Sequence, residues 1–290
     1  THAQNVTRRM DVDIFPYIGH RPIAEIDPPE LLDVLRRIEA RGALDVMARV
    51  KQICGQVFRY GIATGLCQRD PSADLKGALK VNKTTSYACL DIKEMPEFLE
   101  CLERNDARLF ATTRRAIKML MLTFVRTSEL INATWDEFDF ENHVWEIPGW
   151  RMKMRNPHIV PLSRQAVEIL KEQKKEVGHL KTDWVFPSQV RHKNPISNNT
   201  VLFAIGRMGY KKRMTGHGFR ALAMSNIKEK LGYRHEVVDR QLAHAHKSKI
   251  DRAYDRAQFL DERKKMMQEW ANYLDQLTIG GTVLKLREAA

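Results

Sequence analysis

The sequence is poor in cysteine and in long apolar runs. Its four cysteines, Cys54, Cys67, Cys89 and Cys101, lie at least 12 positions apart, and no C-x-x-C pair occurs. We therefore expect four free thiols, and neither a disulfide framework nor a zinc site. No run approaches the roughly 18 apolar residues that a membrane span needs, and no signal-peptide core follows Thr1. These absences favour a cytoplasmic protein without a membrane partner.

The charge is strongly positive and unevenly distributed. The chain carries 48 basic and 36 acidic side chains, a net charge of +12. Residues 1–80 hold 12 basic and 10 acidic side chains, whereas residues 81–290 hold 36 and 26. An excess of this size attracts polyanions through long-range potential and counterion release. Nucleic acid is the first candidate partner and an anionic membrane surface the second, although a protein that is merely basic has the same charge.

The first 80 residues have helical periodicity. Residues 3–14 are expected to form one helix. Asp27 is expected to cap a second, with Pro28 and Pro29 in its first turn and Gly42 after its end. A third helix is predicted from apolar residues at helical spacing, namely Val46, Val50, Ile53, Val57 and Tyr60. We expect these helices to form one compact bundle over residues 1–80.

Residues 76–88, KGALKVNKTTSYA, are polar and basic and lack helical periodicity. The part at 81–88 is predicted to link this bundle to a second domain, residues 89–290. Three short segments there, WDEFDF, HVWEI and HIVPL, are rich in aromatic and β-branched residues. They predict a small three-stranded antiparallel sheet, with Lys153 in the turn between the second and third strands. The remaining segments have helical periodicity, so the fold class is mainly α. A C-terminal helix, 259–277, should bury its apolar stripe on its own domain or on a neighbouring molecule.

Six polar residues stand in separate phrases of the second domain. They are Arg126 in TFVRTSEL, Lys153 in RMKMR, His217 and Arg220 in GHGFR, His244 in QLAHAHKSK, and Tyr254 in DRAYDRA. Each has an ordinary alternative: Arg126 could pair with Glu129 at a helix end, and Lys153 could be a solvated turn residue. Together they supply two guanidiniums, an ammonium, two imidazoles and a phenol. That set suits attack of a tyrosine on a DNA phosphodiester.

Metal binding is not expected from the pair His244 and His246, because no Cys, Asp or Glu stands at a complementary ligand spacing. We therefore predict no metal and no cofactor.

The order and spacing of these phrases resemble the tyrosine recombinase, or phage integrase, family. TFVRTSELINATWDEFDF, MKMRNPHIVPLS, TGHGFRALA and QLAHAHKSKIDRAYDRA are most similar to integrases of prophages and genomic islands. The resemblance covers nearly the whole chain. It implies a helical core-type DNA-binding domain over 1–80 and a catalytic domain with the DNA breaking-rejoining fold over 89–290. Such integrases usually also carry an N-terminal arm-binding domain, so a chain starting at Thr1 is expected to be a fragment or a processed form.

The resemblance implies a site-specific recombinase that cuts and rejoins DNA through a 3′-phosphotyrosine, to integrate or excise a mobile element. Tyr254 is then the nucleophile, and Lys153 protonates the departing 5′-oxygen. Glu129 supports the site by orienting a cation. The residues expected to donate to the non-bridging phosphate oxygens are Arg126, His217, Arg220 and His244.

DNA attachment sites are the implied partners, bound by a tetramer in which the 259–277 helix is a candidate contact between protomers. The isolated chain is compatible with a monomer, and accessory DNA-bending or directionality proteins are expected in a nucleoid-associated reaction. The residues predicted to bind DNA phosphates are Arg114, Arg115, Arg151, Arg155, Lys211, Lys212 and Arg213. Two alternatives stay open: a type IB topoisomerase-like enzyme, and a catalytically silent DNA-binding regulator of the same fold.

Overall fold

The computed structural model describes residues 2–81, 88–243 and 259–280, and the chain divides into two compact units, 1–85 and 86–290. Each unit has its own apolar core. The described residues are mainly helical and include a small three-stranded antiparallel sheet, which confirms the predicted fold class. Most of the predicted linker, 81–88, lies outside the described residues. Among the helices that are described, none is long and apolar enough to cross a membrane.

The first unit is a small helical bundle. Its elements are α1 His2–Asp13, α2 Phe15–Ile18, η1 Ile23–Glu25, α3 Pro28–Ala40, α4 Leu44–Ala63 and η2 Ala73–Leu75. Asp27 caps α3 as predicted, because its side chain accepts a hydrogen bond of 2.8 Å from the backbone N–H of Glu30. Gly42 follows the end of this helix with a φ of 76°, a left-handed conformation that glycine adopts without strain.

The buried face of α4 coincides only in part with the apolar residues that predicted this helix, since Val50 is buried and Val46 and Ile53 pack against the core. Val57 and Tyr60 are 45% and 69% exposed. The side of α4 that packs in the core is offset by one position and consists of Met47, Val50, Cys54, Gly55, Phe58 and Gly61. Both sets have helical spacing, so periodicity alone does not separate them. This face packs closely at two glycines, since a Cβ at Gly55 would lie 2.6 Å from Ser72 Oγ and a Cβ at Gly61 would lie 2.9 Å from Cys67 Sγ.

The second unit consists of helices and the small sheet. Its helices are η3 Ile92–Glu94, α5 Met95–Arg104, α6 Ala111–Thr123, α7 Thr127–Ile131, η4 Trp135–Glu137, η5 Gly149–Arg151, α8 Arg164–Val177, η6 Gly178–Leu180, α9 Asn198–Ile205, the π-helix η7 Gly206–Tyr210, α10 Gly218–Leu231, α11 His235–Gln241 and α13 Leu260–Gly280. Its strands are β1 Phe138–Asp139, β2 Val144–Ile147 and β3 His158–Pro161. The strands lie in the order β1-β2-β3, and Ile147 pairs with His158.

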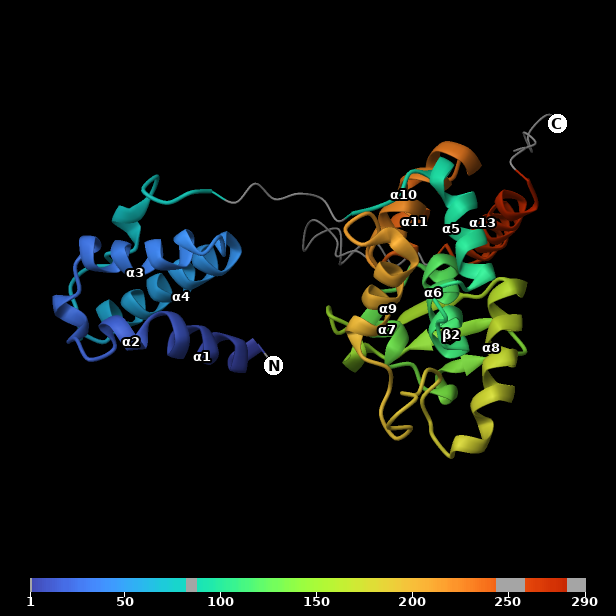
Figure 1. Ribbon diagram of the computed structural model, residues 1–290, viewed down its shortest axis with the longest axis horizontal. Helices are drawn as coiled ribbons and strands as arrows, with labels where there is room; N and C mark the ends of the chain where they lie inside the picture. The colour runs from blue at the N-terminus through green and yellow to red at the C-terminus, as the bar shows by residue number, and fades with distance from the viewer. Residues whose placement is uncertain (1, 82–87, 244–258, 281–290) are drawn as a thin grey trace. The chain divides into compact units, whose positions relative to one another are not determined.

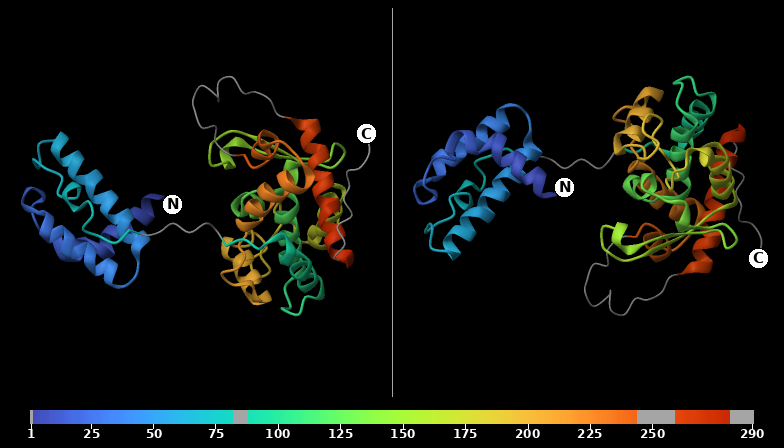
Figure 2. Two further views of the ribbon diagram at one scale, coloured as in Figure 1. Left: turned by 90° about the horizontal axis from the view of Figure 1, so that it is seen from above. Right: turned by 90° about the horizontal axis from the view of Figure 1, so that it is seen from below.

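Helix α6 lies in the middle of this unit, against α7, α8, α9, α10 and α13 (Figures 1 and 2). Its residues Ala116, Ile117 and Leu120 are fully buried, as expected for a central helix.

The apolar stripe of α13 packs within its own unit. Trp270 is 1% exposed, donates a 2.9 Å hydrogen bond to the carbonyl of Met121, and meets Phe124 edge to face at 5.8 Å between ring centroids. Met266 and Leu277 on the same stripe are also buried. Of the two alternatives that the sequence left open, the described chain shows packing on its own unit. The role of this helix as a contact between protomers stays a prediction.

Candidate active site

Arg126 lies at the junction of α6 and α7. Phe124, the C-cap residue that follows α6, has a left-handed conformation with a φ of 56°, and Arg126 is the N-cap residue of α7. One carboxylate holds both its backbone and its side chain. The backbone N–H donates to Glu129 Oε2 at 2.8 Å, and Nη1 donates to Glu129 Oε1 at 2.6 Å. The Arg126 side chain is 22% exposed and that of Glu129 is 4% exposed, so a buried carboxylate orients a partly accessible guanidinium.

Arg220, on α10, is buried and held by backbone carbonyls. Its Nη1 donates to the carbonyl of Phe124, and its Nη2 donates to the carbonyl of Leu242 at 2.6 Å. Its Nε is buried and has no hydrogen-bond partner among the described residues. Burial, and next the positive charge of Arg126, lower the pKa of Arg220 to about 10. The group is still a cation at neutral pH, and the effect of Arg126 places the two guanidiniums in each other's field.

Both arginines meet the chain just before His244. Helix α11 ends at Gln241, and Ala243 has a φ of 48°. Arg126 Nη2 donates to the carbonyl of Ala243 at 3.3 Å, beside the bond from Arg220 to the carbonyl of Leu242. Two of the predicted catalytic residues therefore converge on the backbone that leads into His244. The residues 244–258, which include His244 and Tyr254, lie outside the described part of the chain, so their placement stays a prediction.

His217 stands at the N-cap position of α10, one turn before Arg220, and its side chain makes no capping hydrogen bond. Its side chain is exposed, and its carbonyl accepts a 3.1 Å hydrogen bond from the backbone N–H of Arg220. The glycines on either side permit close packing. A Cβ at Gly216 would lie 2.4 Å from Thr127 Oγ1, and a Cβ at Gly218 would lie 2.5 Å from the carbonyl of Ala88. The packing role of these two glycines was not predicted from the sequence, although both are visible beside the histidine in GHGFR.

Lys153 lies in the segment between β2 and β3 and is exposed. Arg126, Arg220 and Glu129 are called the arginine site below. The segment between β2 and β3 contacts this site through Arg151, whose Nη1 donates to the carbonyl of Glu129 at 3.1 Å.

The prediction that Arg151 binds DNA phosphates needs correction. Its side chain is 6% exposed and forms an ion pair of 2.5 Å with Glu137, whose side chain is 5% exposed. The charge of Arg151 is thus neutralised by a carboxylate inside the protein, whereas the hydrogen-bond acceptors of Arg220 are neutral carbonyls.

The other residues predicted to bind DNA differ in how many hydrogen bonds and ion pairs they make within the protein. Arg114 donates to the carbonyl of Leu102 at 3.0 Å, and Arg115 pairs with Glu172 and Glu176 on α8. Arg213 pairs with Glu94 at 2.7 Å and lies over the ring of Tyr210. These cations already neutralise acidic groups or pack against helices. The exposed members of the set are Arg155, Lys211 and Lys212, together with Arg213. Their contact with DNA stays a prediction.

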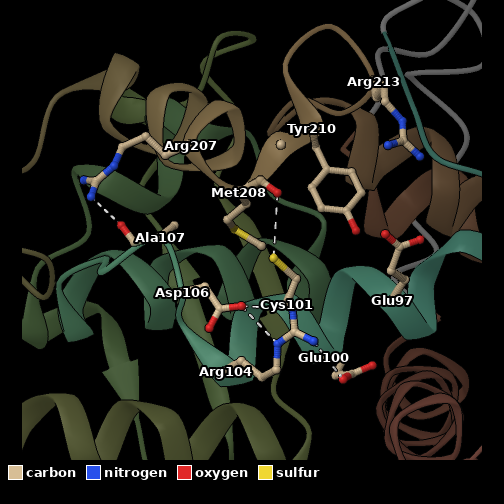
Figure 3. A pocket seen from close by; sticks show the side chains of 11 residues that line it. Glu97, Glu100, Cys101, Arg104, Asp106, Ala107, Arg207, Met208, Tyr210 and Arg213 are labelled. Atoms are coloured by element: carbon tan, nitrogen blue, oxygen red, sulfur yellow. Dashed lines mark hydrogen bonds and ion pairs between the residues drawn. The ribbon is translucent and has the colours of Figure 1, made fainter.

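One pocket, of about 420 Å³, lies between α5 and η7 (Figure 3). Its charges largely pair with one another, since Arg104 contacts Glu100 at 3.2 Å and Asp106 at 2.9 Å. Figure 3 also shows Arg207 directed at the carbonyl of Ala107, to which it donates. None of the predicted catalytic residues lines this pocket. Within the described residues, no cluster of three or more His, Cys, Asp or Glu is placed to hold a metal ion.

Comparison with known proteins matches each of the two units to a family model. The family model for the phage integrase central domain matches residues 1–78, and that for the phage integrase family matches residues 89–260. The chain is 37% identical to the integrase of Enterobacteria phage P4, over 94% of this chain and 65% of that protein. It is 36% identical to the prophage integrase IntS of Escherichia coli K12, over 95% of this chain and 70% of that one. The chain thus spans about two thirds of the length of these relatives.

Solved structures share the fold. A Tn1549 transposon integrase in complex with transposon right end DNA has a TM-score of 0.71 at 17% identity, and covers 92% of this chain and 93% of that chain. A lambda integrase dimer bound to a COC′ core site has a TM-score of 0.65 at 17% identity, with coverage of 89% and 88%.

The fold and the two matched regions define an integrase-type protein. The chain belongs to the phage integrase family, the tyrosine recombinases, and is similar to the integrases of phage P4 and of prophages. The family predicted from the catalytic phrases is confirmed.

Proposed function

We propose that the protein is a site-specific recombinase that cuts and rejoins DNA through a 3′-phosphotyrosine on Tyr254, to integrate or excise a mobile element. The observation that carries the proposal is the convergence of Arg126 and Arg220 on the carbonyls of Ala243 and Leu242. These carbonyls directly precede His244 in the sequence. Residues from three distant parts of the chain thus form one cationic centre, as a phosphate-binding site requires.

The two guanidiniums are held in place before any substrate arrives. Glu129 fixes Arg126, and the carbonyls of Phe124 and Leu242 fix Arg220. Preorganised donors of this kind stabilise the charge that develops on the non-bridging oxygens, and this is usually the largest catalytic contribution. The buried Nε of Arg220 lacks an acceptor among the described residues. Leaving a buried donor without an acceptor costs about 1–3 kcal/mol.

The chemistry follows from the remaining residues. The phenol oxygen of Tyr254 forms a bond to phosphorus while the bond to the 5′-oxygen breaks, and Lys153 supplies the proton that this oxygen needs. His217 and His244 donate to the non-bridging oxygens, and His217 can also accept the phenol proton. A 5′-hydroxyl from another duplex reverses the attack. The phosphodiester energy is retained in the covalent intermediate, so strand exchange needs neither ATP nor another cofactor.

Double-stranded attachment sites are the proposed substrate, and a tetramer on DNA is the proposed assembly. Two observations on relatives support this: one lambda integrase structure is a dimer on a core site, and another is a tetramer bound to a Holliday junction. Phosphate contacts from Arg155, Lys211 and Lys212 would supply much of the affinity. We propose that the reaction takes place on the nucleoid in the cytoplasm, with accessory bending or directionality proteins.

Covalent trapping tests the proposal. The protein is incubated with a nicked duplex that carries the attachment site, and the adduct is resolved on a denaturing gel. Wild type and Tyr273→Phe, a matched change of a buried tyrosine on α13, should form the adduct, and Tyr254→Phe should not. Persistence of the adduct in Tyr254→Phe would rule out this nucleophile. Supercoil relaxation without Holliday junctions would favour the topoisomerase-like alternative, and DNA binding without any adduct would favour the silent regulator.

A further inference from the structure

Arg151 is anchored to the core of the small sheet. Its Nη2 contacts Glu137 Oε2 at 2.5 Å, and the same oxygen accepts a 2.8 Å hydrogen bond from Trp145 Nε1. Trp145, on β2, is fully buried. The carboxylate between the indole and the guanidinium therefore ties the segment after β2 to the most rigid part of the unit.

The other arm of Arg151 reaches the arginine site. Its Nη1 donates to the backbone carbonyl of Glu129 at 3.1 Å, and the carboxylate of Glu129 holds Arg126 at 2.6 Å. One guanidinium thus connects the residue that orients Arg126 to the segment that carries Lys153. The planar fork of an arginine carries donors on two separate nitrogens at a fixed spacing, whereas a lysine ammonium presents all its donors from one nitrogen.

The segment between β2 and β3 folds back on itself around this anchor. The backbone N–H of Arg151 donates to the carbonyl of Pro148 at 3.0 Å, and that of Arg155 donates to the carbonyl of Met152 at 3.0 Å. A Cβ at Gly149 would lie 2.7 Å from the carbonyl of Arg155, so the two ends of the segment are in close contact. Met152 is buried, whereas Lys153 is exposed. The backbone is fixed on one side of Lys153 and its ammonium is left accessible.

Stability alone is a poor explanation for this arrangement. Burying an ion pair gains little over burying apolar residues of the same volume, because both ions lose their hydration. The Nε of Arg151 is also buried without a hydrogen-bond partner among the described residues, which adds a further cost. A role in holding geometry accounts for both features.

We propose that Arg151 is a positioning residue for leaving-group protonation: it fixes the Lys153 segment against Glu129 and so places the lysine ammonium relative to Arg126. The inference rests on the proposed function, in which Lys153 protonates the 5′-oxygen. Displacement of a catalytic group by about 1 Å can cost on the order of 100-fold in rate. Loss of Arg151 should therefore reproduce much of the loss of Lys153 without removing any group that touches DNA.

The test compares two leaving groups in the full chain. One nicked duplex carries the natural phosphodiester at the cleavage position, and the other carries a 5′-bridging phosphorothiolate. Sulfur leaves as a thiolate and needs no proton. The variant Arg151→Met/Glu137→Gln removes the guanidinium, avoids an uncompensated buried charge, and keeps an acceptor for Trp145. Arg151→Lys is the conservative variant. We expect cleavage of the phosphodiester to slow by about tenfold to 100-fold, and cleavage of the phosphorothiolate to stay within about twofold of wild type, as for Lys153→Met.

Two controls separate the outcomes. Arg155→Met removes a proposed DNA contact on the same segment and should reduce the cleavage of both duplexes by the same factor. Thermal unfolding of each variant reports any loss of fold. An equal slowing of both substrates in the Arg151 variants would overturn the inference and leave Arg151 a structural residue. If the wild type cleaves neither duplex, the proposed function itself fails.

Discussion

Arg126 and Arg220 donate hydrogen bonds to neighbouring backbone carbonyls, Arg126 Nη2 to Ala243 at 3.3 Å and Arg220 Nη2 to Leu242 at 2.6 Å. The two guanidiniums come from the start of α7 and from α10, yet they share one short stretch of chain. The relationship works in both directions. The carbonyls hold the cations against their mutual repulsion, and the cations hold the backbone from which His244 follows.

The two arginines should differ in what their loss does to the fold. Arg126→Ala and Arg220→Ala should each slow single-turnover cleavage by about 100-fold to 1,000-fold, as expected for removal of a preorganised donor. Arg220→Ala should also lower the free energy of unfolding by about 1–3 kcal/mol, because the buried carbonyls of Phe124 and Leu242 lose their donor. Urea unfolding measures this difference. Equal stability of the two variants would show that Arg220 does not support the fold.

Glu129 should affect cleavage through Arg126. Glu129→Gln keeps an acceptor for the backbone N–H of Arg126 but removes the negative charge that holds its guanidinium. We expect cleavage to slow by about tenfold while DNA affinity, measured by fluorescence anisotropy, changes little. Glu168→Gln is the matched control, since Glu168 forms an exposed pair with Arg164 on the surface of α8 and exposed pairs contribute little. A cleavage rate for Glu129→Gln as high as for this control would exclude the orienting role.

His158 should make the fold sensitive to acid. Burial, and next the charge of Arg263, lower the pKa of His158 from 6.5 to about 3, and its Nε2 donates to the carbonyl of Gln241. The unfolded chain therefore takes up a proton below pH 6.5 that the folded chain does not accept until about pH 3. The free energy of unfolding should fall by about 2 kcal/mol through this residue between pH 7 and pH 5. Urea unfolding of His158→Gln should show a correspondingly weaker pH dependence, and parallel profiles would contradict the prediction.

Salt dependence should separate cations that meet DNA from cations that pair within the protein. Lys211→Ala/Lys212→Ala should reduce the slope of log K against log salt concentration by about 2, because each lost phosphate contact removes about one unit. Arg115→Ala should leave the slope nearly unchanged, since Arg115 is engaged with Glu172 and Glu176. Binding titrations at several salt concentrations measure both. A larger change for Arg115 than for the lysine pair would reverse the assignment.

Much of the fold and the arginine site could be predicted from local signals. Asp27 before two prolines specifies a helix start by itself, and the alternation in HVWEI and HIVPL specifies strands. The phrase TFVRTSEL places Glu129 one turn from Arg126, which is where the structure has their ion pair. The cleavage roles of Lys153, His217, His244 and Tyr254 stay predictions.

The failures have a common cause. Arg151 stands in the basic turn RMKMR, and nothing local reveals that Glu137 and the carbonyl of Glu129 lie beside its guanidinium. The buried face of α4 was likewise decided by what packs against it, because apolar residues at helical spacing occur on two adjacent sides of that helix. Tertiary contacts between segments distant in sequence leave no periodic signal.

The central claim is that Arg126 and Arg220 act on one scissile phosphate. A nicked duplex with a methylphosphonate at the cleavage position tests it most directly, because one charged non-bridging oxygen is replaced by a neutral methyl group. Cleavage of this duplex should be at least about tenfold less sensitive to Arg126→Ala and Arg220→Ala than cleavage of the phosphodiester, whereas the deficit of Lys153→Met should be the same on both. Arginine deficits of equal size on the two duplexes would contradict the account.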